Sequence, residues 1–451
     1  MKTIFFTIAT RARINFILRT DIFETLKERG FKLVIISPFG EDEKFISEFG
    51  GDNVIFEPLP CMGRLGLLVN FWRNTALEIS HPILTQTRFV HSRIIRRFVK
   101  AKKNIVKIKG MVRRIILGMI PPQWRSNPKF WDGVEKFFIK NKHSRALFKK
   151  HQPSVVILAS AGAEGIDTLF VTYAKRFNVP TVAVDNNIDV FEFRYFSTPR
   201  SITKWALFSN VQQEEAKKIQ KIPADKLIIT GPARYDHYFR NFKPMSRNDF
   251  FKQIGADPNK KLITYGAKTP KMFPHNDEVM NSIVNGIQSG TINKQSQLFV
   301  RFDSGHNPEQ YNTLLEKIVW ESADKKSHRN HVANLLYYSD VVISVGSTFN
   351  IEACFVHTPS IWIGFGDIQG KVKREDSYRL AYDIPLYDRI LDTEAIKFVE
   401  TPESLVEQIQ KYLKDKTLDE EKRKVLVEQE YSITDGRSGE RIANLIESIS
   451  R

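Results

Sequence analysis

The chain has 451 residues and a formal net charge of +17, and 42% of its residues are hydrophobic. This composition is that of a globular protein and excludes a disordered one, and the length predicts roughly two or three domains. Only two cysteines occur, Cys61 and Cys354, and they lie far apart in the sequence. A disulfide or zinc framework is therefore excluded, and we expect a reducing, cytoplasmic environment.

The sequence begins with MKTIFFTIATRAR, a short apolar run with one lysine that no small-residue cleavage site follows. We interpret it as a first β-strand at Ile4–Ile8 rather than as a signal peptide. A helix around Asp21–Arg29, closed by Gly30, and a second strand at Leu33–Ser37 are expected next. No window is apolar over the roughly 18 to 20 residues of a membrane-spanning helix, so we expect a protein that is soluble or lies on a surface.

The positive charge is concentrated in one segment. Between Ile79 and Trp131 there is no Asp or Glu, whereas thirteen Lys and Arg residues alternate there with aliphatic residues. An apolar face beside a cationic face, followed by Trp124, is typical of helices that lie in a bilayer interface. We therefore predict that residues 88–120 contact an anionic membrane surface. A solvated helical hairpin remains the alternative, and nucleic-acid binding is not expected because no recognised nucleic-acid module accompanies the segment.

After this segment, strand-like apolar runs alternate with helical patterns, which is typical of βαβ units and parallel sheets. Helices are expected at Ala163–Phe177 and, after the turn residues Asp435 and Gly436, at about Ser438–Ile449. The further strands expected in the first half are Ser154–Ala159, Thr181–Val184, Trp205–Phe208 and Leu227–Thr230. Those expected in the second half are Leu262–Tyr265, Gln297–Phe302, Val341–Val345 and Ser360–Ile363.

The two sets of strands predict an α/β fold of two Rossmann-like, doubly wound domains that face a cleft. We expect an N-terminal domain at 1–240, with a basic helical insertion at about 79–131, and a C-terminal domain at 241–434. The junction falls near residues 231–260, where prolines and a polar stretch interrupt the pattern. We expect residues 435–451 to form a helix that packs back across either domain.

Ligands of open α/β sheets bind beyond the carboxyl ends of the strands. In the segment Tyr338–Phe365, a strand runs into Gly346, Ser347 and Thr348, which open a helix that carries Glu352. Helix-terminal amides, a glycine that permits close approach and two hydroxyls fit a diphosphate, and Glu352 could accept hydrogen bonds from a ribose. The alternative is that Ser347 or Thr348 only caps the helix and that Glu352 is a solvated acid.

The same segment resembles the donor-site signature of two-domain glycosyltransferases of the GT-B type, especially bacterial capsule and teichoic-acid-like enzymes and sugar-nucleotide 2-epimerases. Lys226–Asp236 (KLIITGPARYD) is similar to the interdomain strand and turn of this group. Ser154–Val184 is similar to the elements that end its amino-terminal domain. The likeness covers residues 150–240 and 325–366 well and residues 1–40 loosely.

Two segments depart from the pattern of the glycerophosphotransferases in this group. Asp185–Asp189 stands where those enzymes usually have a His-Gly pair, and Arg301–His306 stands in place of Arg-x-His-Pro. Arg301 can still contact a phosphate. His331, shortly before a strand, fits a plain surface histidine as well as a site residue.

The resemblance implies a nucleotide-sugar donor and residues that would bind it. These donor-binding candidates are Gly231, Arg234, Gly266, Lys268, Arg301, Gly346, Ser347, Thr348 and Glu352. The first loop lacks the glycine-rich turn common in this fold and offers three arginines, which suggest an acidic acceptor or a phosphate-bearing lipid carrier. These acceptor-binding candidates are Arg11, Arg13 and Arg19, and the alternative is that they are surface charges at a helix entry.

A glycosyl transfer with inversion needs a base for the acceptor proton and cations or amides for the departing diphosphate. Asp185 and Glu164 are the candidate catalytic bases, with Asp189 and Asp167 as alternatives. Asp185 has the better position because it directly follows a strand. No D-x-D pair of the metal-dependent relatives follows a strand, so we predict that no metal is needed. No cofactor is expected, since the nucleotide-sugar is a substrate.

We therefore predict a cytoplasmic glycosyltransferase, peripheral on the inner face of the cell membrane. It would transfer a sugar from a nucleotide diphosphate to a capsule or other cell-envelope glycan, or to a lipid-linked acceptor. Three alternatives share the fold: a sugar-nucleotide 2-epimerase, a polyol-phosphate transferase, which the missing His-Gly pair disfavours, and a non-catalytic scaffold that binds lipid or polyanions.

Overall fold

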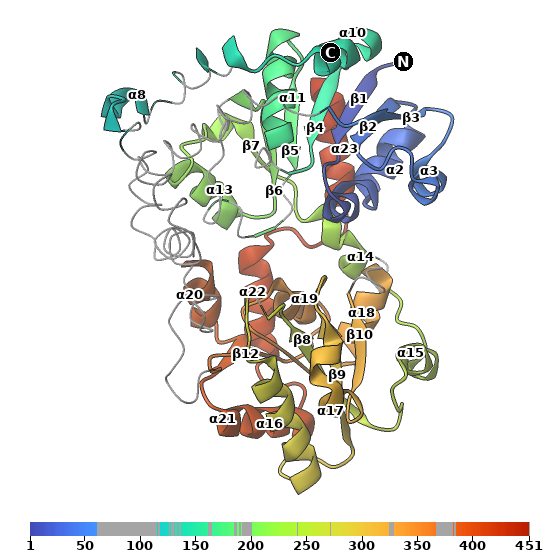
Figure 1. Cartoon of the computed structure of the whole chain (residues 1–451), viewed down its shortest axis with the longest axis vertical. Coiled ribbons are helices and arrows are strands. Elements are labelled where there is room, and N and C mark those ends of the chain that lie inside the picture. Colours follow the sequence, from blue (N-terminus) through green and yellow to red (C-terminus); the bar gives the residue numbers. More distant parts are fainter. Residues whose placement is uncertain are drawn as a thin grey trace. The chain divides into compact units, whose positions relative to one another are not determined.

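The computed structural model divides into two compact units, which are coloured along the sequence in Figure 1. Unit 1 comprises Met1–His91, Arg97–Arg240 and Gln429–Arg451, and unit 2 comprises Ser92–Arg96 and Asn241–Glu428. The structure describes all residues except 61–114, 116–117, 126, 128–129, 131–132, 135–136, 161–164, 185–186, 189–190, 192–200, 241, 271, 324–328, 367–381, 383–384 and 451. The insertion predicted at about 79–131 therefore lies almost entirely outside the described residues.

The described part of unit 1 contains a parallel sheet of seven strands in the order β3-β2-β1-β4-β5-β6-β7. Strand order reverses between β1 and β4, whose paired residues run from Ile4 with Val155 to Thr7 with Leu158. Inner strands such as β4 and β5 are buried throughout, because helices cover both faces of the sheet. The strands are β1 (Thr3–Thr7), β2 (Lys32–Ser37), β3 (Val54–Pro58), β4 (Val155–Leu158), β5 (Thr181–Val184), β6 (Lys204–Leu207) and β7 (Leu227–Ile229).

Successive side chains of β1 point to opposite faces of this sheet and enter two different cores. Phe6 packs with residues of α2 and α23, whereas Phe5 packs with residues of α10 and α11. The helices and helical turns described in unit 1 are α1 (Arg11–Arg13), η1 (Ile14–Leu18), α2 (Asp21–Glu28), α3 (Glu43–Phe49), α8 (Pro122–Arg125), α10 (Lys142–His151), α11 (Gly165–Arg176), α13 (Asn210–Lys218), η3 (Ala224–Lys226), η4 (Ala233–Tyr235), α14 (Asp236–Phe239) and α23 (Ser438–Ile449).

The described part of unit 2 contains a parallel sheet of six strands in the order β10-β9-β8-β11-β12-β13, so its order reverses between β8 and β11. The strands are β8 (Lys261–Ala267), β9 (Ser296–Phe302), β10 (Val319–Ser322), β11 (Val341–Ser344), β12 (Ser360–Ile363) and β13 (Ile396–Val399). The helices are α15 (Arg247–Ile254), α16 (Asn276–Ser289), η5 (Pro308–Tyr311), α17 (Asn312–Leu315), α18 (Arg329–Tyr338), α19 (Thr348–Phe355), α20 (Pro385–Asp392), α21 (Pro402–Lys414) and α22 (Glu420–Glu430).

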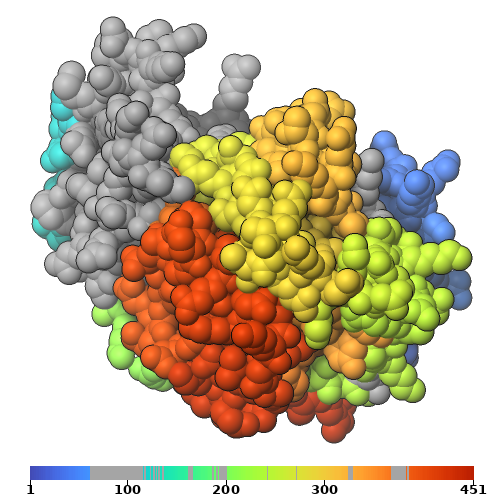
Figure 2. All heavy atoms as spheres, turned by 90° about the horizontal axis from the view of Figure 1, so that it is seen from below, coloured from blue at the N-terminus to red at the C-terminus, as the bar shows by residue number. Residues whose placement is uncertain are grey.

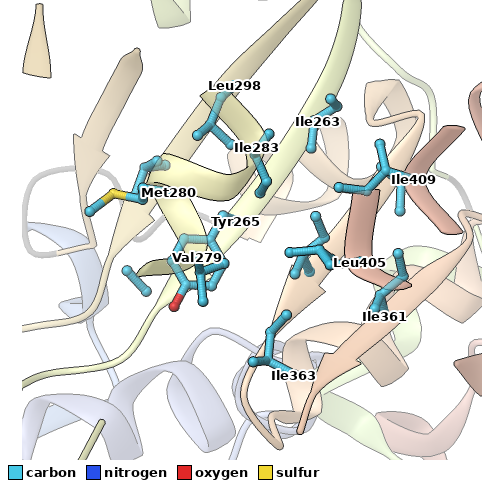
Figure 3. Close-up of a cluster of buried hydrophobic side chains, with 14 of the residues drawn as sticks. Ile263, Tyr265, Val279, Met280, Ile283, Leu298, Ile361, Ile363, Leu405 and Ile409 are labelled. Atoms are coloured by element: carbon cyan, nitrogen blue, oxygen red, sulfur yellow. The ribbon is translucent and has the colours of Figure 1, made fainter. Parts of the chain in front are cut away.

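The main core of unit 2 lies between its sheet and the helices α16 and α21. Ile263 and Tyr265 of β8 pack there with Met280 and Ile283 of α16 and with Ile409 of α21 (Figure 3). A second cluster joins the opposite face of the sheet to α15 and α18. The sheet is therefore covered on both faces, and its strand ends remain the places where a ligand can approach.

Counted from its own first strand, each unit has the order 3-2-1-4-5-6 of Rossmann-like sheets, and unit 1 adds a seventh strand. The predicted α/β fold of two Rossmann-like domains is confirmed. The strands β3, β10 and β13 are not foreseen in the sequence. Residues 429–451 belong to unit 1, where α23 packs against α2. Among the described helices, none is long and apolar enough to cross a membrane.

Candidate functional site

The switch point of unit 2 brings two of the predicted donor-binding residues together. The chain leaves β8 at Ala267 and continues into Lys268, and it leaves the adjacent β11 at Ser344 and reaches Gly346 two residues later. The Nζ of Lys268 donates a hydrogen bond of 2.7 Å to the carbonyl oxygen of Gly346. The loops after these two strands are therefore tied to each other where open α/β sheets bind ligands.

Gly346 turns the chain from β11 into α19, and its own polar groups are all engaged. Its φ of +44° lies in the left-handed region, which favours glycine. Its N–H donates to the Oη of Tyr382 at 2.8 Å, and its carbonyl oxygen accepts from Tyr387 Oη at 3.0 Å as well as from Lys268. The amide of Gly346 is thus not offered to a ligand while Tyr382 holds it.

Ser347 caps the helix, as the alternative interpretation of the sequence has it. Its Oγ accepts a hydrogen bond of 3.3 Å from the N–H of Phe349, and α19 begins at Thr348. Within the described residues, no acceptor is found for the N–H groups of Ser347 and Thr348 or for the Thr348 hydroxyl, and both residues are partly exposed. Capping therefore leaves donors at the helix start that an anion can use.

Two other candidates flank this turn. Glu352 is partly exposed and lies four residues after Thr348, on the same side of α19. Its contact with a ribose remains a prediction. At Gly266 an added Cβ would lie 3.1 Å from the ring of Phe349, so this glycine lets β8 and α19 pack closely. Gly266 is thereby accounted for by packing, without a ligand.

Arg301 is bound to a different partner from the one expected. Its guanidinium group forms an ion pair with Glu321, the residue opposite it on β10. The other carboxylate oxygen of Glu321 lies 2.7 Å from Nε2 of His331, which is buried and not a surface residue. The cluster joins β9, β10 and α18. Phosphate binding by Arg301 remains a prediction.

The interdomain motif that contains Gly231 and Arg234 lies in unit 1. Gly231 has a φ of +86°, and an added Cβ there would lie 2.5 Å from Ser438 Oγ and 2.8 Å from the carbonyl oxygen of Ile433. The carboxylate of Asp236 accepts hydrogen bonds from the N–H groups of Ser438 (3.1 Å) and of the next residue, Gly439 (2.7 Å). The structure therefore explains the motif's glycine and aspartate by the docking of α23. Donor binding by Gly231 remains a prediction.

The three arginines of the first loop differ in their partners and in their burial. Arg11 pairs with Asp42 at 3.3 Å, and Arg19 pairs with both carboxylate oxygens of Glu48 at 2.5 and 2.8 Å. Both pairs are at least partly exposed, which fits the alternative of surface charges. Arg13 is buried and lies over the ring of Phe16, with its guanidinium carbon 5.6 Å from the ring centre.

Arg234 lies over the same ring as Arg13, at 4.4 Å from the centre of Phe16. The structure thus brings together one residue predicted to bind acceptor and one predicted to bind donor. The contact of Arg234 joins η4 to η1, whereas that of Arg13 is made between α1 and the adjacent η1. Whether either binds a substrate remains a prediction.

The candidate bases Asp185 and Glu164, and the alternative Asp189, lie outside the described residues. Asp167, the other alternative, is fully buried at the switch point of unit 1. Its carboxylate accepts hydrogen bonds from Thr7 Oγ1 at 2.9 Å and from the hydroxyl of Ser160. Because Thr7 ends β1 and Ser160 follows β4, Asp167 ties two strand ends together and is too enclosed to serve as a general base in this state.

Two residues of the unit 2 turn are missed by sequence reasoning. Tyr382 and Tyr387 lie 36 and 41 residues beyond Gly346, and no local pattern connects them to it. Their rings pack with each other at 5.4 Å and with Trp362 of β12 at 5.8 and 5.1 Å. In the sequence, only the aromatic residues downstream of the turn could have indicated that these two tyrosines contact it.

The groove described in unit 2 is not lined by residues of this turn. In the described residues, no group of three or more His, Cys, Asp or Glu side chains is placed to hold a metal ion. A groove of about 720 Å³ runs between α16 and α21, which lie side by side on the face shown in Figure 2. None of its lining residues is a predicted site residue. We therefore locate the candidate site from the strand ends and the hydrogen bonds.

Comparison with known proteins finds the fold but no close relative. No family model and no curated protein matches the chain. The solved UDP-GlcNAc 2-epimerase of Neisseria meningitidis, bound to UDP-GlcNAc, is similar with a TM-score of 0.54 and 12% identity, covering 99% of this chain and 100% of that chain. HepE of Anabaena, in complex with UDP and glucose, has a TM-score of 0.51 and 10% identity, with coverage of 99% and 100%.

A glycosyltransferase of Rickettsia africae is similar with a TM-score of 0.50 and 13% identity, covering 99% of this chain and 98% of that chain. At such low identities the likeness shows the fold and not the activity. It agrees with the two Rossmann-like sheets of this chain and with the resemblance stated from its sequence. The chain therefore has the GT-B fold, which glycosyltransferases and sugar-nucleotide 2-epimerases share.

Proposed function

We propose that this chain is a glycosyltransferase that moves a sugar from a nucleotide diphosphate to a capsule or other cell-envelope glycan, or to a lipid-linked acceptor. The observation that carries the proposal is the turn after β11, where Lys268, the N–H groups of Ser347 and Thr348 and the start of α19 lie at the switch point of unit 2. UDP is the nucleotide to test first, because two structural neighbours hold UDP or a UDP-sugar.

The proposed reaction is a displacement at the anomeric carbon of the donor sugar. An acceptor hydroxyl oxygen attacks this carbon, the bond from the carbon to the diphosphate oxygen breaks, and the hydroxyl proton passes to Asp185 or Glu164. The departing diphosphate keeps the electron pair. Its negative charge is stabilised by the amides at the start of α19 and by the ammonium group of Lys268, so no metal or resident cofactor is proposed.

The proposal is tested by removing one backbone donor without removing the helix. Proline at position 348 deletes the N–H group, and proline suits the first residue of a helix. The preceding Ser347 has φ of −138° and ψ of 143°, a conformation that a following proline tolerates. We expect Thr348→Pro to weaken UDP binding at least about tenfold in calorimetry, since a hydrogen bond to a charged group contributes about 1.5–3 kcal/mol.

Thr348→Ala is the matched variant, because it removes the hydroxyl and keeps the N–H group. We expect it to bind UDP more tightly than Thr348→Pro and both variants to unfold near the temperature of the native chain. Equal UDP affinity of the native chain and Thr348→Pro would remove this turn from the site. A native chain that binds none of the uridine, cytidine, guanosine and thymidine diphosphates would favour a non-catalytic scaffold.

We further propose that the enzyme acts at the inner face of the cell membrane. The segment from 79 to 131 carries thirteen basic and no acidic residues, which suits an anionic lipid surface. Described residues in and just after it expose large apolar side chains: Met119 is 78% exposed, Phe137 66% and Trp124 53%. Exposed aromatic and aliphatic side chains beside cationic ones favour an interfacial position near a lipid-linked acceptor.

A sugar-nucleotide 2-epimerase is the second candidate, because the same fold occurs in a UDP-GlcNAc 2-epimerase whose match covers 99% of this chain. The two activities are separated by their need for an acceptor. Incubation with UDP-GlcNAc alone, followed by nuclear magnetic resonance, would show the C2 epimer if the chain is an epimerase. A transferase would leave the configuration at C2 of the sugar unchanged and would release UDP only when an acceptor is added.

A further inference from the structure

Three side chains from separate parts of unit 2 converge on the peptide groups of one residue, Gly346. Lys268 follows β8, Tyr387 belongs to α20, and Tyr382 precedes that helix in the sequence. The carbonyl oxygen of Gly346 accepts from Lys268 and from Tyr387, so both of its lone pairs are used. The N–H group donates to Tyr382, the one acceptor found for it within the described residues.

Tyr382 also connects this turn to the next strand. Its hydroxyl accepts from the N–H of Gly346 at 2.8 Å and donates to the carbonyl oxygen of Ile363, at the end of β12, at 2.9 Å. A phenol can do both at once, whereas a phenylalanine can do neither. The hydroxyl of Tyr382 therefore bridges the carboxyl ends of two neighbouring strands, β11 and β12.

We propose that Tyr382 is a positioning residue for the nucleotide donor: it fixes Gly346 so that the N–H groups of Ser347 and Thr348 are held ready for a diphosphate. The inference rests on the proposed function. Tyr382 contacts the turn through Gly346, and its proposed effect on the donor passes through that residue. Preorganised donors bind an anion more tightly than donors that must first be ordered, because the ordering cost is already met in the free protein.

Tyr387 supplies the matched control. Its hydroxyl shares the carbonyl of Gly346 with Lys268, so its loss leaves that carbonyl still hydrogen-bonded. Loss of the Tyr382 hydroxyl instead leaves a buried N–H group without an acceptor. Both substitutions to phenylalanine keep the ring contacts between the two residues, at 5.4 Å, and those of Tyr382 with Phe398, at 5.1 Å.

The experiment measures UDP affinity by calorimetry, and hydrogen exchange of peptides that contain residues 341–350, in the full-length native chain, Tyr382→Phe and Tyr387→Phe. We expect Tyr382→Phe to weaken UDP binding about tenfold and to speed exchange at Gly346. We expect Tyr387→Phe to change UDP affinity less than about threefold. The melting temperature of each variant is measured alongside, so that general destabilisation is recognised by faster exchange throughout unit 2.

The possible outcomes separate this inference from the function on which it rests. Faster exchange at residues 341–350 with native UDP affinity would overturn the positioning role of Tyr382 and leave the donor site intact. Equal losses of affinity in Tyr382→Phe and Tyr387→Phe would also overturn it. If the native chain binds UDP and only Tyr382→Phe is impaired, the inference holds. If the native chain binds no nucleoside diphosphate, the proposed function fails and the inference fails with it.

Discussion

Gly231 shows how a residue carried over from a family motif can be required for packing. In the sequence it belongs to an interdomain turn and is assigned to donor binding by resemblance. In the structure it has a left-handed backbone and faces Ser438 and the carbonyl of Ile433. The motif follows β7 and packs against the start of α23 and the segment before it. We therefore expect a substitution there to act first on the stability of unit 1.

We expect Gly231→Ala to lower the free energy of unfolding by about 2–4 kcal/mol, since the backbone strain of an alanine adds to a clash with backbone. Gly30→Ala is the control. Gly30 also belongs to unit 1 and has a φ of +75°, but an added Cβ there would meet nothing within 4 Å. It should cost only about 1–2 kcal/mol of strain. Urea unfolding measures both, and equal losses would show that the close contact with α23 does not matter.

Single residues also show which parts of the candidate site could be predicted from the sequence. Gly346, Ser347 and Thr348 are neighbours in the sequence, so a strand followed by small polar residues is enough to expect a helix-terminal turn. Tyr382 reaches that turn only through the tertiary fold. The pairing of Arg301 with Glu321 depends on the register of β9 and β10, and the sequence does not reveal β10. Its partner could not be foreseen for that reason.

Among the elements, the sequence is most informative for strands inside the sheets. The inner strands β4 and β11 are apolar and buried along their whole length. The strands that escape prediction, β3, β10 and β13, all lie at sheet edges, and β3 and β10 are only partly buried. An edge strand pairs on one side only and needs no continuous apolar run, so its pattern resembles a loop. Helix α23 is predicted at its observed bounds because the turn residues Asp435 and Gly436 precede it.

The docking of α23 depends on a charged pair at its start. Asp435 binds both terminal nitrogens of Arg441, at 2.7 and 2.8 Å, and Arg441 Nε donates to the carbonyl oxygen of Thr230, which follows β7. The hydrogen bonds from Arg441 lower the pKa of Asp435 from its usual value of 3.8 to about 2. The carboxylate thus orients an arginine that fastens the helix to the end of a strand.

Because the pKa of Asp435 is lowered in the folded state, the stabilisation by the pair of Asp435 and Arg441 depends on pH. The stabilisation is fully present above pH 3.8 and is lost as the pH falls towards about 2, where Asp435 is protonated in the folded protein as well. We expect Asp435→Asn to be less stable than the native chain at pH 6 and the difference to shrink by pH 3. Chemical unfolding at both pH values checks this, and a constant difference would mean that the charge has no part in docking α23.

At the scale of the whole molecule, most of the net positive charge lies in the segment from 79 to 131. Two units with Rossmann-like sheets account for a GT-B fold without it. An addition that carries most of the net charge must be explained separately. Its composition predicts that it places the protein at a membrane surface rather than taking part in the chemistry.

We expect deletion of residues 88–120 to abolish sedimentation with vesicles that contain anionic lipid and to leave UDP binding unchanged. A milder variant, in which Lys102, Lys103, Lys107 and Lys109 are changed to Gln, should lose about 1 kcal/mol of membrane binding per charge. Vesicles of neutral lipid are the control for apolar contacts. Unchanged sedimentation of the Gln variant would refute an electrostatic contact, and unfolding of the deleted chain would identify the segment as core.

Residues 429–451 rejoin unit 1 after the chain has passed through unit 2. Lys2, just before β1, donates a hydrogen bond of 2.8 Å to the carbonyl oxygen of Ser450, just after α23, so residues near the two ends of this sequence are in contact. Residues 241–428 are therefore one continuous stretch of chain between two parts of unit 1. A protease cut near residue 240 would leave residues 241–428 intact. Loss of the last twenty residues of this sequence would instead remove α23, which packs over Phe23 and Leu26 of unit 1.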